Sequence, residues 1–197
     1  MKFTIGKTEI VKALSSTLGV VEKRQALPIL SNILLVVEEN SISITATDLE
    51  SEVQTRCSPT KVESTGSTTA PAKKLNELCR LLPDGSEIII FLNGDKLCIE
   101  SGSGKYSIST LPSEDFPVFD VTSEKTEFTI LGSVLRNLIS KTAFAMGNQD
   151  WRHYLNGMYL NIEDKNITAV TTDAHRLAIS TNTTTKSIKG ELSGIIP

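Results

Sequence analysis

The first twenty residues carry a strand-then-helix pattern of apolar positions. A short stretch at 2–5 alternates as a strand does, and a longer segment near 7–20 follows it. Within that segment Ile10, Leu14 and Leu18 recur every four residues. This spacing places the three side chains along one face of an amphipathic helix.

A hairpin is predicted after this helix. Residues 31–38 and 41–47 are rich in apolar side chains, and the second stretch alternates cleanly between Ile or Ala and Ser or Thr. Alternation with a period of two is typical of a half-buried strand. The polar residues 38–40 between the stretches suit a turn.

The same pattern recurs 125 residues later in an ungapped register, since Phe3-Thr4-Ile5 aligns with Phe128-Thr129-Ile130 and Thr47-Asp48 with Thr172-Asp173. The register holds for about fifty residues, which indicates duplicated units. The second copy is expected to contain a strand, a helix and two strands at 127–130, 132–145, 155–162 and 166–172.

A weaker third unit lies between the two copies. Its helix is predicted from the apolar stripe of Leu75, Leu78, Cys79 and Leu82. The Asn-Gly turn at 93–94 predicts a hairpin after it. The helix, the three strands and a following linker are expected at 72–82, 87–92, 96–100, 106–111 and 112–124.

These units predict two domains. Two complete units fill a first domain at 1–120, and the third unit starts a second domain at 121–197 that does not receive its partner unit. Because a half-domain leaves a helix face and a sheet edge uncovered, the chain is expected to be a truncated portion of a longer protein.

Composition excludes several classes of protein. The three cysteines form no CxxC pair, which favours a reduced, cytoplasmic protein over a disulfide framework or a zinc site. No apolar run approaches the roughly 18 residues of a membrane span, and no secretory signal is visible. The net charge is −3, so a strong grip on nucleic acid by bulk charge is not expected.

Positive charge nevertheless gathers on the predicted helices. The helix near 132–145 carries Arg136 and Lys141 with no acidic residue, and the other two helices also have an excess of cations. Exposed helix faces often carry such residues, but three helices with the same sign favour a surface that meets phosphates weakly. The cations of the other two helices are Lys7, Lys12, Lys73, Lys74 and Arg80.

Several motifs resemble one family along nearly the whole chain. They include Leu27-Pro28-Ile29-Leu30, Pro71-Ala72-Lys73-Lys74, Tyr154-Leu155-Asn156-Gly157-Met158 and Thr172-Asp173-Ala174-His175-Arg176-Leu177-Ala178. They are similar to the beta subunits of bacterial DNA polymerase III, the sliding clamps. The resemblance implies an α+β fold, a DNA clamp fold built from repeated βαβββ units with helices on one face of a curved antiparallel sheet. A third clamp domain is absent from this sequence.

The resemblance also implies a function. Full-length members close into a head-to-tail dimer around duplex DNA and serve as the processivity factor of the replicative polymerase. They tether polymerase and clamp-loader subunits through short linear peptides. They are non-catalytic accessory subunits with no cofactor and no metal. As a fragment, this chain is not expected to form the ring dimer.

Site residues follow from the matching motifs. DNA contacts are expected at Arg24, Lys73, Gln149, His153 and Tyr154. His153 stands where relatives commonly have tyrosine, and Ala174 where many have glycine. The peptide pocket is expected to include Leu155, Thr172, Ala174, His175, Arg176 and Leu177. The ring-closing edge strand is expected to include Tyr106 and Ile108, for which core packing is an equal rival.

Two other interpretations stay open. Asp173 and His175 would lie on one face of a strand and, with a serine, could form a hydrolytic triad, but no GxSxG motif, metal-binding spacing or phosphate-binding loop occurs. Alternatively, the chain is a natural short, non-ring, clamp-like protein that binds partner peptides.

Overall fold

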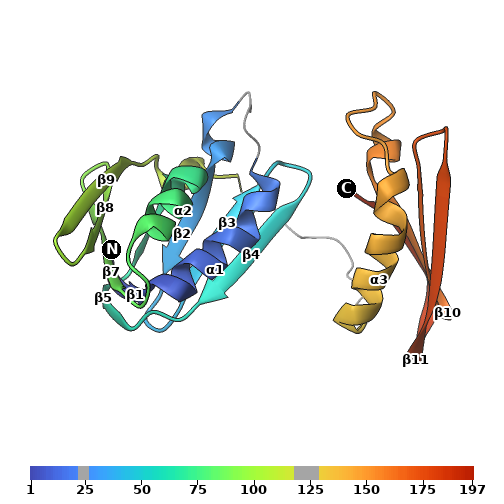
Figure 1. Ribbon diagram of the computed structural model, residues 1–197, viewed down its shortest axis with the longest axis horizontal. Coiled ribbons are helices and arrows are strands. Elements are labelled where there is room, and N and C mark those ends of the chain that lie inside the picture. Colours follow the sequence, from blue (N-terminus) through green and yellow to red (C-terminus); the bar gives the residue numbers. More distant parts are fainter. Residues whose placement is uncertain (22–26, 118–128) are drawn as a thin grey trace. The chain divides into compact units, whose positions relative to one another are not determined.

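The computed structural model describes residues 1–21, 27–117 and 129–197 and divides the chain into two units, Met1–Asp120 and Val121–Pro197 (Figure 1). The first unit contains two antiparallel sheets, in the strand orders β4-β3-β2-β6 and β5-β1-β7-β8-β9. The four-stranded sheet consists of β2 (Asn32–Val37), β3 (Ile42–Thr47), β4 (Glu52–Cys57) and β6 (Gly66–Pro71). The five-stranded sheet consists of β1 (Lys2–Gly6), β5 (Lys61–Ser64), β7 (Glu87–Asn93), β8 (Lys96–Ser101) and β9 (Gly104–Ser109).

Two halves of the first unit exchange their leading strands. Strand β1 precedes helix α1 (Lys7–Thr17) but pairs with β7 of the second half. Strand β6 precedes helix α2 (Ala72–Leu81) but pairs with β2 of the first half. The two helices lie side by side against the sheets (Figure 1). This arrangement makes each half depend on the other for a completed sheet.

The apolar stripes predicted for these helices face the core. Ile10 and Leu14 of α1 and Leu75 and Cys79 of α2 are fully buried. They join one cluster with the inward-facing residues of both sheets, such as Ile90. Burial of this apolar surface is the main stabilising contribution to the unit.

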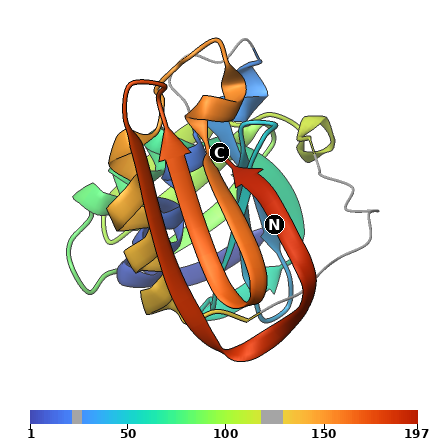
Figure 2. The same cartoon turned by 90° about the vertical axis from the view of Figure 1, so that its right-hand side faces the viewer.

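The second unit repeats the first half of the first unit. Helix α3 (Gly132–Thr142) is the counterpart of α1, and it packs against β10 (Met158–Thr172) and β11 (Leu177–Ile196), as Figure 2 shows. The short 3₁₀ turns Leu18–Val20 and Pro28–Ser31 recur as Ala143–Ala145 and His153–Asn156, each 125 residues later.

Strand register is repeated as well. Ile42 pairs with Cys57 in the first unit, and Ile167 pairs with Asn182 in the second. The predicted α+β fold of repeated units is therefore confirmed.

The second unit has a hydrophobic core of its own. Leu138, Ile162, Ile167 and Ala169 are fully buried and form its centre.

Several predicted boundaries were wrong. Residues 127 and 128 of the strand expected at 127–130 lie outside the described residues, and Thr129 and Ile130 are not in a strand. Their counterpart β1 is held by β5 and β7, and the described part of the second unit contains no equivalents of those two strands. Residues 155–157 precede β10 because His153–Asn156 form a 3₁₀ turn.

The hairpin expected between 155–162 and 166–172 lies within β10, whose ribbon doubles back at its middle in Figure 2. Residues 158–163 pair with 191–196 of β11 and residues 166–172 with 177–183, and the register shifts on both sides of Asp164, whose φ is 51°. Sequence reasoning missed β4, β5, β6 and β11.

Within the described residues, no helix has the length and apolar character that crossing a membrane requires.

Candidate nucleic-acid and peptide-binding surfaces

Cations on the helices are mostly free of ion pairs. Lys73 on α2 is partly exposed, and within the described ranges it pairs with no carboxylate. The same holds for the other exposed helix cations, Lys12, Lys74, Arg80, Arg136 and Lys141. Unpaired cations at exposed positions are available to phosphate groups.

Lys7 differs from these cations. Its side chain is only 13% exposed, and its Nζ lies 2.7 Å from Oδ1 of Asp84. It also donates a hydrogen bond to the carbonyl of Leu82. The ammonium group lowers the pKa of Asp84, chiefly through the hydrogen bond. Lys7 therefore ties the start of α1 to the segment after α2 and is not a free cation.

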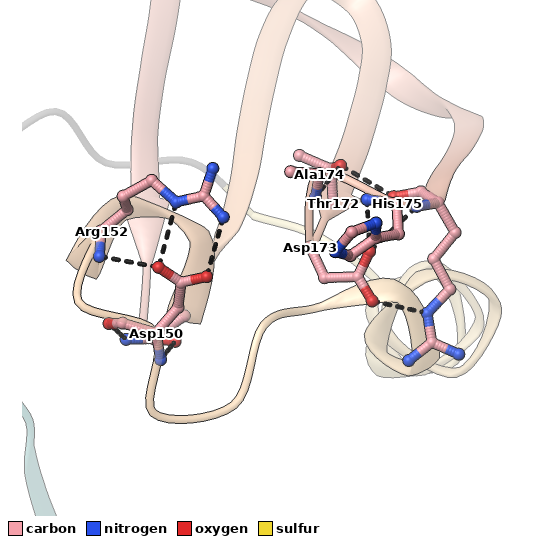
Figure 3. Close-up of polar contacts among 8 residues, drawn as sticks. Asp150, Arg152, Thr172, Asp173, Ala174 and His175 are labelled. Atoms are coloured by element: carbon pink, nitrogen blue, oxygen red, sulfur yellow. Dashed lines mark hydrogen bonds and ion pairs between the residues drawn. The ribbon is translucent and has the colours of Figure 1, made fainter.

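A braced loop connects α3 to β10. Asp150 accepts three hydrogen bonds from Arg152, one from the backbone N–H and two from the guanidinium group at 3.0 and 2.9 Å (Figure 3). Asn156 closes the loop by accepting from the Asp150 N–H and donating to its carbonyl. The Arg152 hydrogen bonds lower the pKa of Asp150 to about 2. The carboxylate is thus ionised, and the loop is preorganised.

This brace presents three of the residues expected to contact DNA. Gln149 is exposed and has a φ of 55°, and His153 is exposed on the following 3₁₀ turn. Tyr154 is 60% exposed, so it is not packed in the core. Arg24 lies outside the described residues. The structure thus brings Gln149, His153 and Tyr154 into one loop and places Lys73 on the other unit.

A turn between β10 and β11 carries five of the six predicted pocket residues. Thr172 Oγ1 donates to the carbonyl of Arg176 at 2.7 Å and accepts from the N–H of Ala174 at 3.1 Å. Asp173 accepts from the N–H groups of His175 and Arg176 (Figure 3). These backbone hydrogen bonds are the main reason that the pKa of Asp173 is lowered.

The turn combines a positive backbone angle with exposed side chains. Ala174 has a φ of 71°, a conformation that glycine adopts more easily, so the departure from the family pattern falls at a strained position. Leu177 is 60% exposed, while Leu155 is buried on the 3₁₀ turn of the other loop. The Arg176 guanidinium lies 5.9 Å from the ring centre of Phe144.

The first unit contains the same turn with different side chains. Thr47 Oγ1 donates to the carbonyl of Ser51 and accepts from the N–H of Leu49. Asp48 accepts from the N–H groups of Glu50 and Ser51. Leu49 has a φ of 75°, close to that of its counterpart in the second unit. The identical Thr-Asp pairs in the sequence therefore reflect a shared turn.

Strand β9 forms an edge of the five-stranded sheet. Tyr106 on this strand is 46% exposed, so it is available to a partner. Ile108 is buried and belongs to the hydrophobic core of the unit. Of the two residues expected at the ring-closing edge, only Tyr106 is exposed on that strand.

The arrangement does not favour a hydrolytic triad. Asp173 and His175 lie in a turn instead of on one face of a strand, and the carboxylate is bonded to backbone N–H groups and to Arg176 Nε. It therefore does not orient an imidazole ring as triad chemistry requires. Among the described residues, no cluster of three or more His, Cys, Asp or Glu side chains could hold a metal ion.

Sequence reasoning missed Phe144, the Asp150–Arg152 brace and Trp151, whose side chain is 82% exposed. Trp151 is the single tryptophan of the chain. A tryptophan among polar loop residues was the one signal that could have identified it, because this residue is usually largely buried.

Comparison with known proteins covers both units. Residues 1–120 match the family described as DNA polymerase III beta subunit, N-terminal domain, and residues 129–197 match its central domain. The chain is 43% identical over 197 residues to the beta sliding clamp of Proteus mirabilis, covering 100% of this chain and 53% of the relative. It is 41% identical over 179 residues to that of Escherichia coli K12, covering 91% and 49%.

Solved structures agree with this result. A sliding clamp of Pseudomonas aeruginosa bound to griselimycin has a TM-score of 0.93 at 41% identity, covering 100% of this chain and 53% of that chain. The polymerase III beta subunit of Caulobacter crescentus has a TM-score of 0.92 at 35% identity, covering 100% and 54%. The chain spans about half the length of the curated relatives it matches. It belongs to the DNA polymerase III beta subunit family.

Proposed function

We propose that this chain supplies the first part of a DNA sliding clamp, the processivity factor of a replicative DNA polymerase. The observation that carries the proposal is the match of the chain, in order, to two consecutive domains of the beta subunit family. In this function the protein has no catalytic role. It links polymerase and clamp-loader subunits to duplex DNA.

The unpaired helix cations support a sliding mode of binding. Lys73 and Arg136 are available to phosphates, while the net charge of −3 keeps the overall attraction weak. A ring is retained on DNA by its topology, so strong phosphate contacts are not needed. Weak contacts at Gln149, His153 and Tyr154 are consistent with movement along the duplex.

The turn at 172–177 supports a peptide-binding role. Exposed Leu177 offers an apolar wall, and His175 and Arg176 offer polar groups beside it. Such a combination suits short peptides with apolar anchors. Leu155 is buried on its 3₁₀ turn and offers a peptide little surface. Tyr106 contributes to ring closure from strand β9.

A chimera tests this proposal. The chain would replace the matching half of the Proteus mirabilis clamp, and the chimera would be loaded onto nicked circular duplex DNA by that organism's clamp loader. We expect retention on the circle through gel filtration and release when the circle is cut once. A dimeric chimera that binds linear and circular DNA equally would overturn the proposal.

A second measurement tests the peptide-binding turn within the same chimera. Leu177→Ala should weaken binding of a polymerase-derived clamp-binding peptide by roughly tenfold, which is the effect of losing one partly buried leucine contact. Glu52→Ala, at the equivalent position of the first unit, should leave peptide binding unchanged. Equal affinities of the two variants would remove the turn from the proposed pocket.

A further inference from the structure

The chain contains the dipeptide Asn-Gly twice, each time after a leucine, at Leu92-Asn93-Gly94 and at Leu155-Asn156-Gly157. An asparagine before glycine is prone to deamidation, in which the next backbone nitrogen attacks the side-chain amide carbon. Glycine favours this attack because it has no Cβ and moves freely. The two asparagines share this intrinsic reactivity, so a difference between them must come from the fold.

The first asparagine is open to the reaction. Asn93 is the last residue of β7, and Gly94 and Asp95 form the turn to β8; all three are exposed. Among the described residues, none forms a hydrogen bond with the Asn93 side chain. Gly94 has a φ of 60°, and a Cβ placed on it would meet no atom within 4 Å. Both the side-chain amide and the peptide that attacks it are therefore free to move.

The attack at this site needs little unfolding. The pair formed by Asn93 and Lys96 is the last of the β7–β8 ladder. Only this end of the hairpin must open before the Gly94 nitrogen can reach Cγ of Asn93. Such local openings at the ends of elements cost little free energy compared with global unfolding.

The second asparagine is restrained through both of its polar side-chain atoms. Its Oδ1 accepts a hydrogen bond from the N–H of Asp150, and its Nδ2 donates one to the Asp150 carbonyl, each at 2.9 Å. Gly157 is buried, and a Cβ there would lie 2.5 Å from Cγ2 of Ile195. The Asn156 amide therefore cannot turn toward the Gly157 nitrogen without breaking both hydrogen bonds in crowded surroundings.

We propose that Asn93 is a site of spontaneous deamidation and that the hydrogen bonds of the 150–156 loop protect Asn156 from the same reaction. The Gly94 nitrogen bonds to Cγ of Asn93, its proton goes to the side-chain nitrogen, and ammonia leaves, which closes a succinimide ring. Water then opens the ring at either carbonyl carbon and gives aspartate or isoaspartate at position 93. The co-reactant is water alone, and the proposal does not depend on the proposed function.

The product changes the surroundings of strand β9. It adds a carboxylate beside Asp95 in a chain whose net charge is −3. Thr110, directly after β9, donates hydrogen bonds from its N–H and its Oγ1 to the Asp95 carbonyl, both at 2.9 Å. Isoaspartate lengthens the main chain two residues before this carbonyl. The reaction should therefore loosen the anchor at the end of this edge strand.

Peptide mass spectrometry of the 197-residue chain after prolonged incubation at mildly alkaline pH measures both sites. Deamidation raises the mass of a peptide by one dalton, and isoaspartyl methyltransferase labels the isoaspartate. We expect Asn93 to convert at least roughly 30-fold faster than Asn156, which is the rate factor for breaking two hydrogen bonds. Equal rates at the two sites, or no conversion at Asn93, would overturn the proposal.

The unfolded chain is the matched control. In urea the two Leu-Asn-Gly segments should convert at similar rates, because the fold no longer distinguishes them. A difference that persists in urea would mean that the fold does not protect Asn156. A native rate at Asn93 far below its rate in urea would show that the turn protects this site as well, contrary to the proposal.

Variants give an independent readout by isoelectric focusing. The incubated chain should develop an acidic band, and Asn93→Gln should abolish it because glutamine would have to close a larger, slowly formed ring. Asn40→Gln replaces another exposed asparagine and should leave the band in place. An acidic band of equal strength in Asn93→Gln would refute the assignment. In the acidic fraction the amide of Thr110 should lose protection from hydrogen exchange, and unchanged protection would overturn the effect on β9.

Discussion

The repeated Thr-Asp turn allows one substitution to be made twice in the same chain. Thr47→Val and Thr172→Val each replace a hydroxyl by a methyl group of similar size. Each removes one hydrogen bond donated to a carbonyl, at 2.9 Å for Thr47 and 2.7 Å for Thr172, and one accepted at 3.1 Å. The geometry is the same, but Thr47 is fully buried and Thr172 is partly exposed.

This difference in burial sets the expected magnitudes. A hydrogen bond contributes about 1 kcal/mol, and a buried group left without a partner costs more because water cannot reach it. We therefore expect Thr47→Val to lower the free energy of unfolding by about 2 kcal/mol, and Thr172→Val by about 0.5–1 kcal/mol because water replaces part of the loss.

Urea denaturation followed by circular dichroism measures both values, and hydrogen exchange assigns each to its turn. The amides of Leu49 and Ala174 should lose protection only in the variant that removes their acceptor. Equal destabilisation by the two substitutions, or a larger effect of Thr172→Val, would refute the argument from burial.

Three further predictions follow from matched or coupled residues. Leu14→Ala should destabilise the first unit by about 3 kcal/mol, because Leu14 is fully buried. Ile139→Ala, at the equivalent position of the second unit, should cost about 1 kcal/mol or less, because Ile139 is 43% exposed. Denaturation midpoints of the two variants would show the difference. The pKa of Asp150 is lowered from 3.8 to about 2, so the contribution of its carboxylate to stability is complete above pH 4 and is lost as the pH falls through 2. A carboxyl NMR titration of Asp150 with a midpoint near 3.8 would contradict the brace. Lys7→Met should raise the pKa of Asp84 toward its ordinary value in the same experiment, and an unchanged pKa would exclude the ion pair.

Elements with a strong apolar period were predicted well from the sequence. The stripe that begins at Ile10 predicted a helix near 7–20, and α1 covers 7–17 with a 3₁₀ turn at 18–20. Strand β4 escaped prediction because its sequence, EVQTRC, is mostly polar and lies at an edge of its sheet, where partial exposure removes the apolar signal. The Asp150–Arg152 brace escaped because a contact between residues two apart in a loop has no periodic signature.

The duplication separates structural identities from functional differences. Thr and Asp are identical in the two turns because their side chains hydrogen-bond the backbone in the same way. A site assignment for Asp173 that relied on this identity would also assign Asp48, although the first turn continues with Glu50 and Ser51 where the second has His175 and Arg176. The scaffold is therefore common to both units, and any recognition specific to the second unit must lie in the side chains that differ. His175, Arg176 and Leu177 are the residues on which mutational tests of that recognition should concentrate.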